Sequence, residues 1–354
     1  MSITLDEARL EAFAGLVATE VGAALNAALI TIGDRLGLYR AMADGQPVSA
    51  GDLAARTSTH ERYIREWLNT QAASGFVTYD AAEDRYTLPL EHAFALTEEN
   101  GPLAMAGIFQ SACALIDNRE RIEQQFLYGA GVGWHEHGDG VFCGVERVFA
   151  ASYRGSLLSS WLPAVDGAVD ALERGGRVLD VGCGHGAPTI LLAQAFPNAS
   201  FVGVDYHVEG IETARERAQA AGVAERVDFQ VATAQDFPGG GYDLVCFFDA
   251  LHDMGDPVGA ARRARQALAD DGVCMVVEPY AEDRIEDNLN PIGRMYYGYS
   301  TLLCTPGALS QDGATALGTQ AGEARLREVL LAGGFSSVRR VAETPLNFVL
   351  EARP

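Results

Sequence analysis

The sequence DVGCGHG, which starts at Asp180, is the stretch whose residue types point most directly to ligand chemistry. An apolar run precedes it, three alternating glycines stand at Gly182, Gly184 and Gly186, and a helical stretch follows. Glycine permits tight turns and a close approach of the backbone to a ligand at the carboxyl edge of a parallel sheet. A second acid, Asp205, ends the next predicted strand, where its carboxylate can accept hydrogen bonds from ribose hydroxyls. The pattern predicts a nucleotide-like ligand.

The glycines alone also fit the loose dinucleotide-binding pattern, so a nicotinamide-dependent oxidoreductase stays open. Two features favour another nucleotide. A further acid, Asp236, with Phe237 beside it, follows the third predicted strand. The chain also ends in two apolar runs, 338–341 and 348–350, whose short link allows only an antiparallel pair.

His252 is the candidate for proton transfer. It follows the predicted strand 242–248, which places it beside the glycine loop at the same edge of the sheet. The pKa of histidine suits a proton acceptor near neutral pH. The alternative is structural: His252 caps the helix that follows.

A loop between Gly129 and Gly144 carries Trp134-His135-Glu136-His137. His-x-His spacing offers two metal ligands, but no third ligand is evident, so we predict no metal site. The glycines instead predict a mobile loop that gates a substrate, with Trp134 and His137 as substrate contacts. Tyr296, in an aromatic run, fits a substrate pocket and core packing equally well.

The first half of the chain is predicted to be mainly helical. An apolar helix spans residues 8–30, and a second one spans 60–73 before a hairpin formed by 76–79 and 85–88. This order is the outline of a winged helix. Arg62 on the expected recognition helix is offset by neighbouring acids, which makes a poor phosphate-binding face.

The second half alternates short apolar runs with helical stretches, which predicts a parallel sheet with helices on both faces. The expected strands are 177–181, 201–204, 227–231, 242–248, 273–277, 338–341 and 348–350.

From about residue 175 to its end the chain resembles the class I S-adenosylmethionine-dependent methyltransferases, whose Rossmann-like sheet has seven strands with a reversed last strand. The first half is similar to the winged-helix dimerisation domain of two-domain small-molecule O-methyltransferases. The resemblance implies S-adenosyl-L-methionine as cofactor and a homodimer. It implies these cofactor-binding residues: Asp180, Gly182, Gly184, Gly186, Asp205, Tyr206, Asp236, Phe237 and Phe248.

The resemblance also implies a mechanism. Relatives carry a Leu-His-Asp-Trp motif whose histidine is the base; His252 and Asp253 match it, whereas Met254 replaces the tryptophan. Relatives orient the histidine with an acid at the end of the next strand, and Glu278 stands there. We therefore expect methylation of a small-molecule hydroxyl. Methylation of nitrogen, carbon or sulfur, and a cofactor-sensing DNA-binding regulator, stay open.

The composition of the chain limits the classes of partner and the cellular location that we expect. The 354 residues are enough for two cores, and the net charge of −22 argues against nucleic-acid binding. Six scattered cysteines favour a reducing compartment, and we expect no signal peptide, no run of membrane length and a cytoplasmic enzyme. We expect a winged-helix dimerisation domain at 1–105, a helical linker and gating segment at 106–172, and a cofactor domain at 173–354.

Overall fold

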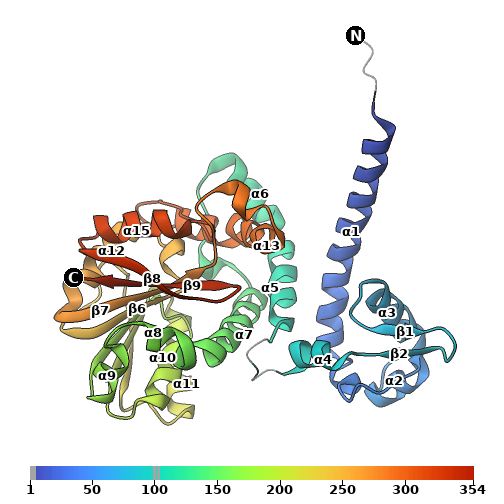
Figure 1. Ribbon diagram of the computed structural model, residues 1–354, viewed down its shortest axis with the longest axis horizontal. Helices are drawn as coiled ribbons and strands as arrows, with labels where there is room; N and C mark the ends of the chain where they lie inside the picture. Colours follow the sequence, from blue (N-terminus) through green and yellow to red (C-terminus); the bar gives the residue numbers. More distant parts are fainter. Residues whose placement is uncertain (1–4, 99–100, 102–103) are drawn as a thin grey trace. The chain divides into compact units, whose positions relative to one another are not determined.

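The computed structural model describes residues 5–98, 101 and 104–354, and the chain divides into two compact units (Figure 1). One unit holds residues 1–114 and 139–151; the other holds 115–138 and 152–354. The segment 106–172, expected as a separate linker, is thus divided between the units.

The N-terminal unit has the predicted winged-helix order of helices followed by a hairpin. Ser49 caps α2 (Ala50–Thr57), since its hydroxyl accepts a hydrogen bond from the Asp52 amide. Trp67 packs edge-on against Tyr39 in the buried core. The other elements are α1 (Glu7–Arg35), η1 (Arg40–Met42), α3 (Glu61–Ala73), antiparallel β1 (Thr78–Asp80) and β2 (Arg85–Thr87), α4 (Leu90–Thr97) and α5 (Ala106–Asp117).

Helix α1 is longer than predicted and keeps an apolar surface. By length and composition it could cross a membrane, so the expectation that no apolar run has membrane length is wrong for this helix. Helices of soluble proteins pass the same test, and the finding is weak evidence of a span. Its exposed apolar side chains are Leu10, Phe13, Leu16, Val17, Val21, Leu25 and Ile32.

The glycine-rich break is shorter than predicted. Helix α7 begins at Asp139 and ends at Ser156, so Gly140 and Gly144 are helical and not part of a loop. A Cβ at Gly144 would lie 2.5 Å from the Ser111 amide nitrogen. Gly144 is therefore required for close packing of α7 on α5. The positions of the glycines in the sequence did not distinguish this packing role from a role in a mobile loop.

The second unit is built on a seven-stranded sheet with strand order β5-β4-β3-β6-β7-β9-β8. β9 is antiparallel to both of its neighbours, β7 and β8, whereas the other pairs in this sheet are parallel, which confirms the reversed last strand. The strands are β3 (Arg177–Val181), β4 (Ser200–Asp205), β5 (Val227–Val231), β6 (Tyr242–Phe248), β7 (Leu268–Pro279), β8 (Ser337–Glu343) and β9 (Asn347–Arg353).

Helices cover both faces of this sheet, as the alternating pattern predicts. Apolar residues of α12 (Pro257–Ala267) and α15 (Gly322–Ala332) join the sheet core on one face. Figure 1 shows α9 (Ala168–Glu173), α10 (Ala187–Ala195) and α11 (Val208–Ala220) on the other face. The remaining elements are α6 (Arg119–Tyr128), η2 (Trp134–Glu136), η3 (Leu157–Trp161), α8 (Leu162–Ala164), η4 (Leu251–Asp253), η5 (Ile285–Asn288), α13 (Pro291–Tyr299), η6 (Ser300–Cys304) and α14 (Thr305–Leu309).

Candidate active site

The glycine loop joins β3 to α10 at the carboxyl edge of the sheet. Gly182, Gly184 and Gly186 have φ values of 78°, 50° and 76°, in the region that favours glycine. A Cβ at Gly186 would lie 2.4 Å from the Phe229 ring, whereas a Cβ at Gly184 would meet no atom of the described residues within 4 Å. Gly186 is therefore needed for packing, and Gly184 leaves the backbone open to a ligand.

Asp180, at the end of β3, is a buried acid with one unused oxygen. Its Oδ2 accepts a 2.5 Å hydrogen bond from the Thr189 hydroxyl. Its Oδ1 is buried and has no hydrogen-bond partner among the described residues. Burial raises the pKa of Asp180 to about 7, against the effect of Thr189. A cationic group of a ligand would favour the ionised form of this carboxyl.

Asp205, the last residue of β4, supports the glycine loop directly. Its Oδ2 accepts from the Gly184 amide at 3.0 Å and its Oδ1 from the His207 amide at 2.9 Å. Burial raises the pKa of Asp205, although both amides favour the carboxylate. Carboxylate oxygens have further lone pairs, so the side chain can still accept from a ligand hydroxyl. Tyr206 beside it is partly exposed.

The remaining predicted cofactor contacts have mixed environments. Asp236 is exposed, whereas the Phe237 side chain is buried in the core. The Arg263 guanidinium stacks 4.3 Å from the Phe237 ring centroid and donates to the Phe237 carbonyl. Phe248, at the end of β6, is buried and meets the Tyr153 ring edge-on at 5.5 Å.

The structure brings Glu278, near the end of β7, together with His252 and Asp253, which follow β6. His252 Nδ1 lies 2.5 Å from Glu278 Oε2, and Glu278 Oε1 accepts from the Leu251 amide at 2.9 Å. His252 Nε2 lies 3.0 Å from Asp253 Oδ1. Burial lowers the pKa of His252, but the two carboxylates outweigh it and raise the pKa well above its usual value.

Asp249 was missed by sequence reasoning although it directly follows a predicted strand. It has φ of +51°, which is uncommon for a residue other than glycine and is found at functional sites. Its carboxylate accepts from the Asn347 amide group at 2.6 Å and from the Tyr153 hydroxyl at 3.4 Å. Burial and Glu278 raise its pKa well above the usual value. An acidic residue directly after the predicted strand 242–248 was the sequence feature that could have identified Asp249 as a site residue.

Two of the predicted substrate contacts lie in the segment before α7. The Trp134 indole donates to Asp253 Oδ2 at 3.2 Å, which links this segment to the catalytic candidates. His137 is buried; its Nδ1 pairs with the Asn118 side chain at 2.9 Å, and its Nε2 has no partner among the described residues. Tyr296 is buried, and its hydroxyl donates to the Leu346 carbonyl at 2.6 Å.

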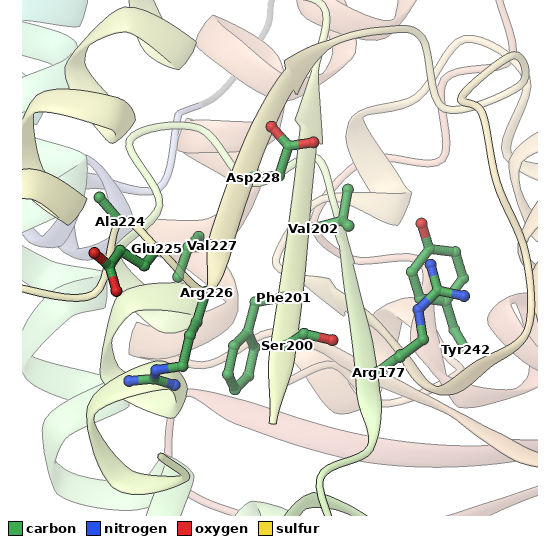
Figure 2. Close-up of a pocket in the computed structure, with 10 residues that line it drawn as sticks. All are labelled: Arg177, Ser200, Phe201, Val202, Ala224, Glu225, Arg226, Val227, Asp228 and Tyr242. Carbon is green, nitrogen blue, oxygen red and sulfur yellow. The ribbon is translucent and has the colours of Figure 1, made fainter. Parts of the chain in front are cut away.

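A hollow of about 360 Å³ lies elsewhere on the same sheet (Figure 2). Its lining includes Arg177, Ser200, Val227 and Tyr242, the first residues of β3 to β6. It therefore lies at the amino edge, opposite the glycine loop. The Arg177 guanidinium already donates to a backbone carbonyl and stacks on Tyr242, so the hollow does not belong to the candidate site.

The chain matches two family models. Residues 172–321 match "Methyltransferase domain", and residues 23–98 match "Rv2258c-like winged HTH domain". The chain is 35% identical to 27-O-demethylrifamycin SV methyltransferase of Amycolatopsis mediterranei over 103 residues, which is 28% of this chain and 38% of that protein. The chain spans about a third of the length of the curated relatives it matches.

Solved structures share the fold over nearly the whole chain. The mitomycin 7-O-methyltransferase has a TM-score of 0.68 at 20% identity, with 99% of this chain and 100% of that chain covered. Human N-acetylserotonin methyltransferase in complex with S-adenosylmethionine has a TM-score of 0.64 at 17% identity, with 100% and 99% covered. The predicted fold is thus confirmed: residues 172–321 form a methyltransferase domain, residues 23–98 match a winged helix-turn-helix domain, and the chain shares its fold with these methyltransferases.

Proposed function

We propose that the chain is an S-adenosylmethionine-dependent methyltransferase that acts on a hydroxyl of a small molecule. One observation carries the proposal: the glycine loop with its buried acid and the His252–Glu278 pair stand at the same edge of the sheet, on the adjacent strands β3, β6 and β7. Methyl transfer needs the cofactor and the methyl acceptor side by side, so the cofactor loop and the proton acceptor must lie at one edge of the sheet.

The loop fits the cofactor. The Oδ1 atom of Asp180 is a buried acceptor without a partner among the described residues, suited to an ammonium group. Asp205 has lone pairs for ribose hydroxyls, and Gly182, Gly184 and Gly186 keep the approach open, with Tyr206, Asp236, Phe237 and Phe248 as further proposed contacts. When bound, S-adenosylmethionine supplies a methyl group on a sulfonium that is already activated for transfer.

His252 is the proposed base, and Glu278 is its positioning residue. With Nδ1 held by Glu278, the Nε2 atom is the one that takes the acceptor proton. Asp253 and Glu278 raise the pKa of His252 above its usual value, because both carboxylates favour the protonated ring. Only the neutral ring can accept a proton, so turnover should rise with pH above neutrality.

Relatives support a small acceptor with a hydroxyl. The names of 27-O-demethylrifamycin SV methyltransferase and mitomycin 7-O-methyltransferase specify transfer to oxygen of small molecules in those proteins. By analogy we propose a small organic acceptor here, with Trp134, His137 and Tyr296 in its pocket and the segment before α7 as its gate. Transfer to nitrogen, carbon or sulfur is the second candidate, because positioning alone can promote it.

The winged helix is not proposed to bind DNA. Arg62 pairs with Glu66 at 2.5 Å, and Arg65 pairs with Glu61 at 2.9 Å, so both arginines of α3 already have carboxylate partners. DNA binding needs arginines available to phosphates. This pairing disfavours the cofactor-sensing regulator.

We propose instead that α1 forms a homodimer contact. Its exposed Phe13, Val17 and Val21 recur at helical spacing on a helix of 29 residues, and a second copy would cover them. The six cysteines are all free, which supports a reducing, cytoplasmic location. Light scattering of the wild type and Val17→Glu tests the dimer; a monomeric wild type contradicts it.

Calorimetric titration with S-adenosylmethionine and S-adenosylhomocysteine tests the proposed function. We expect micromolar binding that Asp205→Ala weakens at least about tenfold, since hydrogen bonds to a charged group contribute about 1.5–3 kcal/mol. Asp228→Ala is the matched control, because Asp228 is exposed on β5 of the same sheet. Absence of binding by the wild type rejects the proposal and favours the nicotinamide cofactors.

A further inference from the structure

Three side chains that can ligate a metal meet beside the proposed base. One donor atom each of His252, Asp253 and Cys304 lies within 4.8 Å of the other two. The three residues are 3%, 9% and 4% exposed. Imidazole nitrogen, carboxylate oxygen and thiolate sulfur together form a ligand set that suits Zn²⁺. We propose that this cluster binds one thiophilic divalent cation of the zinc class.

The buried Asp253 carboxylate also fits a cation. Asp253 Oδ2 accepts from the Trp134 indole, and the polar neighbour of the buried Oδ1 is His252 Nε2, with which it makes no well-aligned hydrogen bond among the described residues. Buried polar atoms nearly always have partners, so such an atom calls for an explanation. Oδ1 lies 3.0 Å from His252 Nε2, so one cation that lies beside this pair would bind both atoms.

The surroundings resemble those of metal-bound histidines. Glu278 holds His252 Nδ1 at 2.5 Å, and a carboxylate on the second ring nitrogen commonly orients a metal-binding histidine. Cys304 ends the π-helical turn η6, and such turns are frequent at functional sites. Three protein ligands leave the fourth zinc position open.

The charges balance when the cation binds. The cation replaces the proton on His252 Nε2 and the thiol proton of Cys304, so two protons leave and no electron is transferred. The two positive charges then face the Asp253 carboxylate and the Cys304 thiolate.

The consequence for catalysis rests on the proposed function. A cation on His252 Nε2 occupies the lone pair that would accept the proton of the methyl acceptor. Zinc should therefore inhibit methyl transfer and leave S-adenosylmethionine affinity unchanged, since Asp180 and Asp205 are not ligands.

Cobalt(II) titration of the full chain, followed by absorbance, tests the site without any assay of methyl transfer. We expect one equivalent to bind with a thiolate-to-cobalt charge-transfer band and tetrahedral ligand-field bands. Cys304→Ser should lose the charge-transfer band and bind at least about tenfold more weakly. Binding without the band, or a band that persists in Cys304→Ser, overturns the proposal.

Two controls keep the result interpretable. Cys143→Ser removes an exposed thiol and should leave the band and the affinity unchanged; loss of the band in this variant overturns the proposal by assigning the metal to Cys143. Circular dichroism and S-adenosylmethionine titration show whether Cys304→Ser is folded, and if it is not, Asp253→Asn must weaken cobalt binding at least tenfold. Failure of methyl transfer alone leaves the metal site standing.

Discussion

Asp180 and Glu278 are equally buried carboxylic acids, each 1% exposed, yet only one has partners for both oxygens. Glu278 accepts from the Leu251 amide and pairs with His252. Asp180 has Thr189 on one oxygen and no partner among the described residues on the other. The carboxylate that holds His252 is thus fully paired within the protein, whereas the Asp180 carboxyl at the cofactor end has one oxygen available to a ligand.

The unpaired oxygen of Asp180 lowers the stability of the folded protein. Burial raises the pKa of Asp180 to about 7, from about 3.9 in an unfolded chain. An acid with a raised pKa destabilises the folded protein progressively as pH increases from about 4 to 7, because the unfolded state ionises first. A bound cationic group would remove this penalty.

Loss of His252 should give the largest effect and test the acceptor end. His252→Ala is expected to lower kcat by about 10²–10⁴-fold, the usual contribution of a general base. The affinity for S-adenosylmethionine should not change, because the residue lies outside the glycine loop. Steady-state kinetics with calorimetric titration measures both quantities. Unchanged turnover would remove His252 from the mechanism.

The two carboxyls should respond in opposite directions to neutral replacement. Asp180→Asn is expected to weaken S-adenosylmethionine binding about 10–100-fold, yet to stabilise the ligand-free protein by about 1 kcal/mol. Glu278→Gln should destabilise it by about 3 kcal/mol, since it breaks a buried pair, and should leave cofactor binding nearly intact. Thermal unfolding without ligand compares the two. Equal shifts of the unfolding temperature with the same sign in both variants would show that Asp180 and Glu278 do not differ in their contribution to stability.

The smallest expected effect is a pH dependence of cofactor affinity. Below its pKa of about 7, Asp180 must lose a proton to pair with an ammonium group, so affinity should rise about tenfold from pH 5.5 to 7. Titrations in wild type and Asp180→Asn measure this slope. A slope that persists in the variant would assign the titration to another group.

Much of the fold was predictable because its signals are local. β3, β5 and β6 have the expected bounds: β3 and β6 are largely buried runs inside the sheet, and β5, at its edge, alternates buried and more exposed residues over its first four positions. The glycine loop was equally visible, because positive φ at Gly182 and Gly186 demands glycine. Gly144 was misread, because a glycine that lets two helices approach has the same sequence signature as one in a loop.

Local sequence patterns were enough to predict the alternation of strands and helices, the glycine loop and the acids at the strand ends. These depend on backbone preference and on hydrophobic spacing, which each short segment carries in full. The pairing of polar atoms depends on the tertiary structure. Both Glu278 oxygens have partners, one Asp180 oxygen has none among the described residues, and Cys304 lies beside His252. Contacts between segments distant in sequence depend on how the whole sheet brings its strand ends together, and no local pattern encodes that arrangement.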